Sequence, residues 1–352
     1  MPRFSICFLA SALLCSLLAA LAPGAADEGR DAARREPGAA LGRGLAFLQR
    51  DAAQWKAERK CATCHHGAMT LWAFNEAKRQ GYAVDAAFLA ELGQWTKTRL
   101  EGIEKPRDPR PGWNLINTPA LYLGVMTRSQ PGVEALSAEE LDRVAGHIGR
   151  HLEEDGSVMT PATMSPPMAA NGPPPVFESR EVLTLLALLA LPPAAPDDPP
   201  DASPAGEARR KAAGWLGAIT PGDDTQAAAL RLLRDVRERQ PKKRLRTAAA
   251  GILGRQNPDG GWGQLRELPS DAFATGQALY ALRLAGVDRK RAEIRRALAF
   301  LAAAQREDGS WPMTSRAHPG AKPFTNPAPI RHIGSCWAIV GLAANRPAGA
   351  GA

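Results

Sequence analysis

The chain has 352 residues, of which 45% are hydrophobic and 23% are charged. This composition is too apolar for a disordered polypeptide, and the length allows one large hydrophobic core. The formal net charge is +8, with one dense basic run that has no interleaved aromatic residues. Without such stacking platforms, we expect a solvated helix face and no nucleic-acid site. The run consists of Arg239, Lys242, Lys243, Arg244 and Arg246.

Residues 1–26 have the pattern of a secretory signal peptide. A short basic start, residues 1–3, precedes an apolar run over 4–21, and small residues follow up to Ala26. We expect cleavage after Ala26 and export to the periplasm or the exterior. Leu14 stands where a lipoprotein signal needs a small residue before Cys15, which disfavours lipidation.

No later segment offers the roughly 20 uninterrupted apolar residues of a membrane anchor, so we expect no integral membrane segment in the mature chain. Residues 27–37 are expected to form a flexible N-terminal segment and 346–352 a disordered tail. Removal of the signal would leave Cys61, Cys64 and Cys336, which is no disulfide framework.

Two nearly identical turns reveal an internal repeat. Residues 256–262 and 305–311 both read Q-x3-G-x-W, and each follows an aliphatic helical pattern. The Gln side chain is expected to satisfy free amides at a helix end, and the Trp to cover the seam between neighbouring helix pairs. Two degraded copies lie at Leu45 to Trp55 and at Ile148 to Val158. The spacing fits a unit of about 50 residues, with further units near 100 and 204.

The repeat predicts six helix pairs over residues 38–345, with the C-x-x-C-H segment 61–65 inserted in the first pair. One helix of each pair is an apolar run, typical of a buried inner ring, so we expect an all-α fold that closes into an α/α toroid. The apolar runs are 69–78, 119–125, 182–191, 225–236, 272–284 and 335–343.

The two Q-x3-G-x-W turns resemble the QW motifs of the prenyltransferase and squalene-oxidase repeat proteins, the squalene-cyclase-like family. An exported bacterial subgroup of that family is also similar in Cys61 to His66, in Ser270 to Leu279, and in Gln305 to Arg316. The resemblance covers most of residues 40–345 and implies the toroid fold. The resemblance does not predict an activity, because proteins with the same fold can catalyse unrelated reactions.

Squalene-hopene cyclases protonate an alkene with an acidic D-x-D-D-T motif, and Asp223 and Asp224 are the weak counterparts here. Pro221 replaces the first aspartate. A buried acid pair can hold a raised pKa and act as a general acid, but a helix cap before Thr225 is the favoured interpretation. With 6% aromatic residues and room for one toroid, we do not expect a competent squalene cyclase.

Protein prenyltransferases use a zinc site of Asp, Cys and His, and no such cluster is evident late in the sequence. His332 and Cys336 lie four residues apart, but in an apolar helix. We therefore expect Cys336 to be a buried structural thiol.

Cys61-Ala-Thr-Cys64-His65 is the C-x-x-C-H pattern of covalently attached c-type haem. Two thiols one helical turn apart reach both vinyl groups of a porphyrin, and the following imidazole ligates the iron. Export favours this interpretation, because haem is attached outside the cytoplasmic membrane. The alternatives are a Cys61–Cys64 disulfide or redox pair, and a metal site that uses His65 and His66.

A sixth iron ligand is available from Met159, Met164 or Met168 in a Pro-rich segment, although these methionines also suit an ordinary loop. His147 and His151 form an i, i+4 pair on a charged helix, where we expect them to face solvent. Adjacent residues rarely ligate the same iron, so His66 is expected to matter less than His65.

The sequence therefore predicts an exported toroid with covalently bound haem c, acting in electron transfer or as a redox-linked binding module with an unknown redox partner. Two alternatives stay open. One is an isoprenoid-type enzyme or a binding protein that holds an apolar small molecule in the toroid cavity. The other is a structural or interaction protein with a Cys61–Cys64 disulfide or a metal site.

Overall fold

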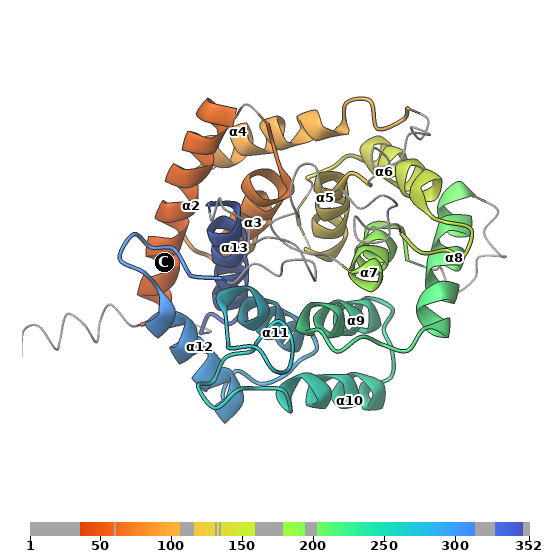
Figure 1. Cartoon of the computed structure of the whole chain (residues 1–352). Coiled ribbons are helices and arrows are strands. Elements are labelled where there is room, and N and C mark those ends of the chain that lie inside the picture. Colours follow the sequence, from red (N-terminus) through yellow and green to blue (C-terminus); the bar gives the residue numbers. More distant parts are fainter. Residues whose placement is uncertain are drawn as a thin grey trace, which may run out of the picture.

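The computed structural model describes residues 36–59, 61–105, 116–130, 132–133, 135–158, 179–193, 203–313 and 328–347. These residues form two concentric layers of helices (Figure 1). The inner layer contains α3 (Thr70–Arg79), α5 (Thr118–Ser129), α7 (Arg180–Ala190), α9 (Thr225–Arg237), α11 (Ala272–Leu284) and α13 (Ala328–Ala344). The outer layer contains α2 (Pro37–Arg59), α4 (Ala86–Lys97), α6 (Ala138–His151), α8 (Pro204–Ala218), α10 (Lys242–Leu253) and α12 (Ala292–Ala304).

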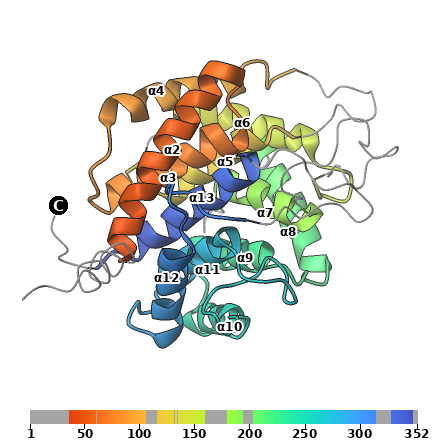
Figure 2. The same ribbon diagram turned by 60° about the vertical axis from the view of Figure 1, so that its left-hand side comes forward.

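The chain alternates between the two layers, so that each outer helix is followed by an inner one. Along the inner layer α5 packs against α7, α7 against α9, α9 against α11 and α11 against α13, while α13 also contacts α3 and α2 and so closes the ring. Figure 2 shows α13 from another side, between α3 and α11. The described residues form isolated β-bridges but no strand. The predicted α/α toroid of six helix pairs is confirmed.

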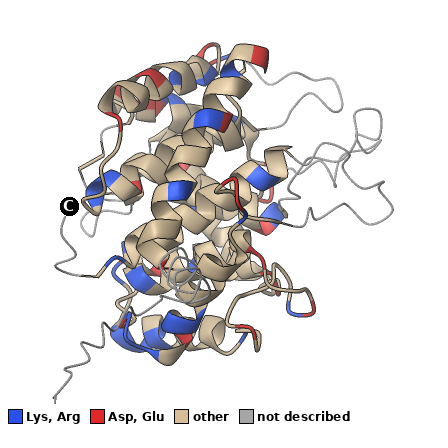
Figure 3. Ribbon diagram, turned by 90° about the vertical axis from the view of Figure 1, so that its left-hand side faces the viewer, with Lys and Arg blue, Asp and Glu red and all other residues tan. Residues whose placement is uncertain are grey.

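The hydrophobic pattern explains which helix lies in which layer. In α11 every residue from Ala272 to Leu282 is buried, whereas α10 buries only Ala249 and Ile252. A helix that is apolar all round must be enclosed, and one with a narrow apolar stripe can cover its outside. The basic positions 242–244 and 246 are exposed on α10, as predicted for a solvated face. Figure 3 shows charged positions of both signs along the outer helices.

Both Q-x3-G-x-W turns fix the seams between outer helices with the same hydrogen bonds. The Gln256 side-chain Nε2 donates to the carbonyl of Glu293 on α12 at 2.7 Å, and Gln305 Nε2 donates to the carbonyl of Ala40 on α2 at 2.8 Å. The prediction that the glutamines bind free amides is wrong: their Nε2 groups donate to carbonyls, and Arg296 and Arg43 donate to their Oε1 atoms. The glutamines therefore join one helix pair to the next.

The tryptophan of each turn lies buried beneath it. The indole Nε1 of Trp262 donates to the carbonyl of Ile252 at 2.8 Å, and that of Trp311 to Leu301 at 2.7 Å. A Cβ added to Gly44 on α2 would lie 2.6 Å from the Trp311 ring. Trp311 therefore fills the seam between the last pair and the first, as predicted.

One of the two degraded copies forms the same turn and the other does not. Gly156, Gly260 and Gly309 all have φ of 90–92°, in the region that favours glycine. By contrast, the prediction of a turn from Leu45 to Trp55 is wrong, because α2 continues without a break to Arg59. Ala53 stands where the other copies have their glycine, so this helix does not end there.

Candidate functional site

The C-x-x-C-H-H segment connects α2 to α3. Residues 61–63 have no regular secondary structure, and Cys64–Met69 form a π-helix that continues directly into α3. The Thr63 Oγ1 accepts a hydrogen bond from the backbone N–H of His66 at 3.1 Å and caps this turn. Single π-helical turns occur frequently at functional sites, since the extra residue re-aims the side chains.

The two cysteines of the motif lie in the first part of this segment. Cys61 is half-buried, its carbonyl accepts a hydrogen bond from the Trp55 indole at 3.1 Å, and its Sγ is 3.6 Å from Arg99 Nη1. The side chain of Cys64 lies outside the described part of the chain. A Cys61–Cys64 bond therefore stays a prediction.

His66 lies at the centre of a buried polar cluster formed by three elements distant in sequence. Its Nε2 is 2.9 Å from Oδ2 of Asp51 on α2, and Nδ1 of His332 on α13 is 2.6 Å from the same oxygen. One ligand atom from each of the three residues lies within 4.8 Å of the others. His66 and His332 are 1% and 0% exposed, so most of this cluster is shielded from bulk water.

His65 and Thr70 extend the cluster on either side. His65 Nδ1 lies 2.5 Å from His66 Nδ1 and 2.9 Å from Thr63 Oγ1. On the other side, Thr70 Oγ1 is 2.7 Å from Nε2 of His332 and donates to the backbone carbonyl of His65 at 3.1 Å. The polar groups thus form one continuous hydrogen-bonded chain from Thr63 to Thr70.

Burial keeps the three imidazoles of this hydrogen-bonded cluster neutral. It lowers the pKa of His66 to about 3, assisted by the charge of His332 and opposed by the hydrogen bond to Asp51. Burial also lowers the pKa of His332 and of His65, and in both Asp51 opposes the shift. For Asp51 burial raises the pKa, but hydrogen bonds from His332 and His66 and their charges hold it well below its usual range. Near neutral pH the cluster holds one carboxylate and three neutral imidazoles.

A small cavity of about 140 Å³ opens beside Asp51 and His66. The Trp55 ring forms one wall and stacks on His66, with a centroid distance of 4.1 Å and an interplanar angle of 9°. Arg331, which also lines the cavity, lies 3.6 Å from Oδ1 of Asp51. The cavity is large enough for waters or a small anion.

The described residues do not leave room for a haem beside His65. The imidazole is only 8% exposed and packs edge-on against Trp55 and His66. The adjacent cavity of about 140 Å³ is well below the roughly 300–1,000 Å³ of sites that hold ligands of cofactor size. Haem c attachment through Cys61, Cys64 and His65 therefore depends on the motif alone and stays a prediction. The proposed sixth ligands Met159, Met164 and Met168 lie outside the described residues.

Asp51 and His332 were missed as site residues in the sequence. His332 stands in an apolar helix, where a polar residue on the buried face is the one available signal. Asp51 follows the buried Leu48 at a helical spacing of three and precedes the buried Ala52. Neither position gives a local pattern, because the three residues meet only where α13 closes the ring. Cys336 is buried in α13, as predicted.

The two weak catalytic candidates are not brought together as an acid pair. Asp224 is buried, and its Oδ1 accepts a hydrogen bond from the backbone N–H of Ala227 at 2.6 Å, which is the predicted cap of α9. Asp223 is exposed and forms ion pairs with Arg255 and Arg266 at 3.0 and 3.4 Å. The carboxylates therefore have separate structural partners.

The predicted solvent exposure of His147 and His151 is wrong, since both are buried. His147 Nδ1 donates to the carbonyl of Ile103 at 3.1 Å, and its Nε2 accepts from the backbone N–H of Asn117 at 3.0 Å. His151 Nδ1 donates to the carbonyl of His147 at 2.9 Å. Both belong to the buried face of α6, where His147 provides partners for two backbone groups outside the helix.

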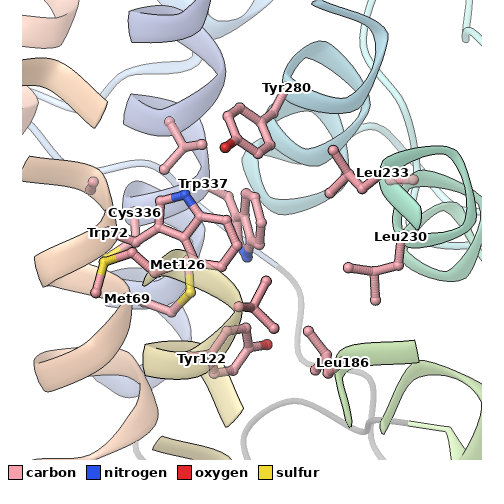
Figure 4. Close-up of a cluster of buried hydrophobic side chains, with 14 of the residues drawn as sticks. Met69, Trp72, Tyr122, Met126, Leu186, Leu230, Leu233, Tyr280, Cys336 and Trp337 are labelled. Atoms are coloured by element: carbon pink, nitrogen blue, oxygen red, sulfur yellow. The ribbon is translucent and has the colours of Figure 1, made fainter. Parts of the chain in front are cut away.

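A second feature lies at the centre of the ring, where four aromatic side chains meet (Figure 4). Trp72, Tyr122, Tyr280 and Trp337 come from four inner helices and are at most 2% exposed. The Trp72 ring centroid lies 5.4 Å from that of Trp337, 6.0 Å from Tyr280 and 6.4 Å from Tyr122. Leu186, Leu230 and Leu233 from α7 and α9 lie on the opposite side of the same centre (Figure 4).

Comparison with known proteins supports the toroid fold. Residues 206–304 match the squalene-hopene cyclase N-terminal domain. A solved structure of a protein from Actinoplanes is 17% identical, with a TM-score of 0.52 over 88% of this chain and 99% of that chain. A type II terpene cyclase from Scytonema, in complex with its substrate geranylgeranyl dihydroxybenzoate, is 15% identical, with a TM-score of 0.51 over 88% of this chain and 96% of that chain. No curated protein sequence is significantly similar to the chain.

Fold and turns thus define an α/α toroid. Residues 206–304 resemble the squalene-hopene cyclase N-terminal domain, and the whole ring has the fold of the terpene cyclase structure. No helix within the described ranges is long and apolar enough to cross a membrane.

Proposed function

We propose that the protein is exported and binds an apolar small molecule of isoprenoid type at the centre of the toroid. The observation that carries this proposal is the convergence of Trp72, Tyr122, Tyr280 and Trp337 at the centre of the inner layer. Aromatic faces and edges pack well against the methyl groups and double bonds of an isoprenoid chain. The leucines opposite them extend the apolar surface.

Unpaired polar atoms in the same layer support a ligand with a polar end. The indole N–H of Trp337 and both side-chain amide atoms of Gln277 are buried and have no hydrogen-bond partner among the described residues. A buried polar group without a partner costs about 1–3 kcal/mol, so a ligand hydroxyl or carbonyl would relieve this cost. The related terpene cyclase from Scytonema has a substrate with an isoprenoid chain and a polar aromatic head.

The proposal is one of binding, not of proton-initiated cyclisation. Asp224 is engaged as a helix cap and Asp223 in surface ion pairs. Glu76, a fully buried acid of the inner layer, accepts hydrogen bonds from Arg79, Gln80 and Gln130. The Glu76 carboxylate oxygens are therefore occupied by side-chain partners.

Ligand binding to the mature protein tests the proposal. Squalene and geranylgeraniol would be added separately, and the bound molecules counted by native mass spectrometry after gel filtration. We expect one molecule per chain, tighter binding of the alcohol, and at least tenfold weaker binding in Trp337→Leu and Tyr280→Leu. Trp215→Leu, on the outer helix α8, is the matched control and should bind like the parent. Binding that is absent, or equally tight in all variants, would contradict the proposal. No cyclic product of squalene is expected.

A c-type haem carrier is the second candidate, favoured by the order Cys61, Cys64, His65 in a chain with a signal-like N-terminus. Attached haem would supply an electron-accepting iron, with His65 as its protein ligand. Because the described residues leave too little space, attachment would require the segment around Trp55 and His65 to open. Expression with haem-maturation machinery should give a red protein whose colour survives acid extraction and is lost in a Cys61→Ala, Cys64→Ala variant. A colourless exported protein excludes this candidate.

A further inference from the structure

We propose that Asp51, His66 and His332 bind a divalent first-row transition-metal ion, with Zn²⁺ as the best match, and leave one coordination position for water or an anion. The site is distinct from the aromatic centre and from the thiols of the C-x-x-C-H motif. Its residues come from α2, the π-helix and α13.

The spacing of the three ligand atoms suits a tetrahedral ion. Two nitrogens lie 2.9 and 2.6 Å from one carboxylate oxygen, and all three atoms lie within 4.8 Å of one another. Zinc bonds of about 2.0–2.1 Å place tetrahedral ligand atoms about 3.3 Å apart. Side-chain rotations that lengthen these two distances by about 0.4 and 0.7 Å would therefore admit the ion.

Proton positions at Thr70 favour a cation between His332 and Asp51. The Thr70 hydroxyl has one proton, which it donates to the carbonyl of His65. Its oxygen then accepts from Nε2–H of His332, 2.7 Å away. This tautomer leaves a lone pair on Nδ1 of His332 that faces the Asp51 carboxylate at 2.6 Å. Nδ1 of His332 and the Asp51 carboxylate can then bind a cation between them, in place of the proton of their hydrogen bond.

His66 can present a lone pair in the same way through the opposite tautomer, with its proton on Nδ1. If His66 Nδ1–H donates to His65 Nδ1, which lies 2.5 Å away, then Nε2 presents its lone pair to the point where His332 and Asp51 also meet. Both imidazoles would then ligate through one nitrogen and donate through the other. This outer hydrogen bonding is the usual device that fixes metal-binding histidines.

The surroundings hold the ligands rigidly and leave one side open. His66 is stacked between Trp55 and His332, with centroid distances of 4.1 and 3.7 Å. Toward solvent the cavity of about 140 Å³ reaches both Asp51 and His66. Three protein ligands with a free fourth position are typical of zinc sites that exchange water or substrate.

Arg331 makes the open side suitable for an anion. Its guanidinium lies 3.6 Å from Oδ1 of Asp51, so that Oδ2 remains for the metal, and 3.6 Å from Asp308 Oδ2. A phosphate or carboxylate bound to the ion would meet the Arg331 charge in this cavity. Two imidazoles and one carboxylate suit Zn²⁺ better than Mg²⁺ or Ca²⁺, which prefer oxygen ligands.

Metal binding to the full mature chain, purified without a histidine tag and freed of metal, tests the proposal. We expect one Zn²⁺ per chain by calorimetry and elemental analysis, and a higher midpoint of thermal unfolding, because the ion would join α2 to α13. Asp51→Asn, His66→Gln and His332→Gln should each abolish stoichiometric binding. Thr70→Val, which keeps the three ligands, should weaken binding about 10–100-fold. His147→Gln, in another buried histidine pair, should bind like the parent.

A spectroscopic measurement keeps the test independent of folding defects in the variants. Co²⁺ added to the parent protein should give the visible absorption of a tetrahedral nitrogen and oxygen site, without a thiolate charge-transfer band, and Cys61→Ser, Cys64→Ser should leave the spectrum unchanged. A thiolate band, or loss of binding in the cysteine variant, would overturn the proposal in favour of a cysteine site. Failure of the folded parent to bind either ion would overturn it outright.

Discussion

The side-chain amide of Gln305 donates a 2.8 Å hydrogen bond to the backbone carbonyl of Ala40, across 265 residues of sequence. Arg43, one turn further along α2, donates to Oε1 of the same Gln305 at 2.5 Å. The two bonds join the last outer helix to the first. Gln256 makes the corresponding bonds to Glu293 and Arg296 inside the repeat, so a local repeat signature also closes the ring.

Gln305→Ala should therefore lower the free energy of unfolding by about 1–3 kcal/mol, since it removes the part-buried hydrogen bonds to Ala40 and Arg43 across the seam. Urea denaturation followed by circular dichroism measures the change. Gln256→Ala should cost a similar amount, because its bonds are equivalent. The exposed Gln54, bonded only to Glu58 one turn away, provides the control, and Gln54→Ala should change stability by less than about 0.5 kcal/mol.

Gly276 sets the close approach of α11 and α13. A Cβ at this position would lie 2.1 Å from the carbonyl oxygen of Trp337, and backbone cannot move away as a flexible side chain can. Gly276→Ala should destabilise the protein by about 3 kcal/mol or more, measured by thermal unfolding. Gly251 on α10 has open space around it, so Gly251→Ala should instead be neutral or stabilise by up to about 1 kcal/mol. Equal effects at the two positions would refute this packing argument.

The two neighbouring aspartates should differ in their contribution to stability. Asp224→Ala removes the side-chain cap of α9 and should cost about 1 kcal/mol, within a range of about 0.5–2 kcal/mol. Asp223→Ala or Asp223→Asn removes only exposed ion pairs and should cost less than about 1 kcal/mol. Chemical denaturation of both variants checks the order. A terpene-forming activity that depends on either residue would show that the carboxylates do more than we infer.

Stability should fall with acid in part through His147. Burial lowers its pKa to about 4, assisted by the charge of His151, whereas in the unfolded chain the value is the ordinary one of about 6.5. The unfolded state therefore takes up a proton first. The contribution of His147 is complete above pH 6.5 and is lost as the pH falls from 6.5 to about 4, because protonation of Nε2 breaks the bond from Asn117.

The measurement is the free energy of unfolding of the parent and of His147→Gln in metal-free buffer between pH 7.5 and pH 4.5. The difference between the two proteins should shrink with acid by on the order of 2 kcal/mol. His66 and His332 have lowered pKa values as well, so both proteins lose stability. A constant difference across the pH range would mean that His147 does not titrate in this way.

Local patterns were sufficient to predict the repeat and the two layers. The apolar run at 272–284 and the basic run at 242–246 predicted an enclosed helix and a solvated one, because exposure of a helix face depends mainly on the residues of that helix. The glycines at 260 and 309 marked turns for a similar reason, since φ near 90° is a local requirement.

Only the tertiary structure decided which side chains form the sites. The motif singled out His65, yet His66 meets Asp51 and His332, which lie 15 and 266 residues away along the chain. His147 is buried, although its helix carries many charges. Helix periodicity specifies a face but not the neighbour that covers it, and ring closure by α13 supplies that neighbour. The repeat thus determined the ring, and the closed ring brought an aspartate and two histidines to one point.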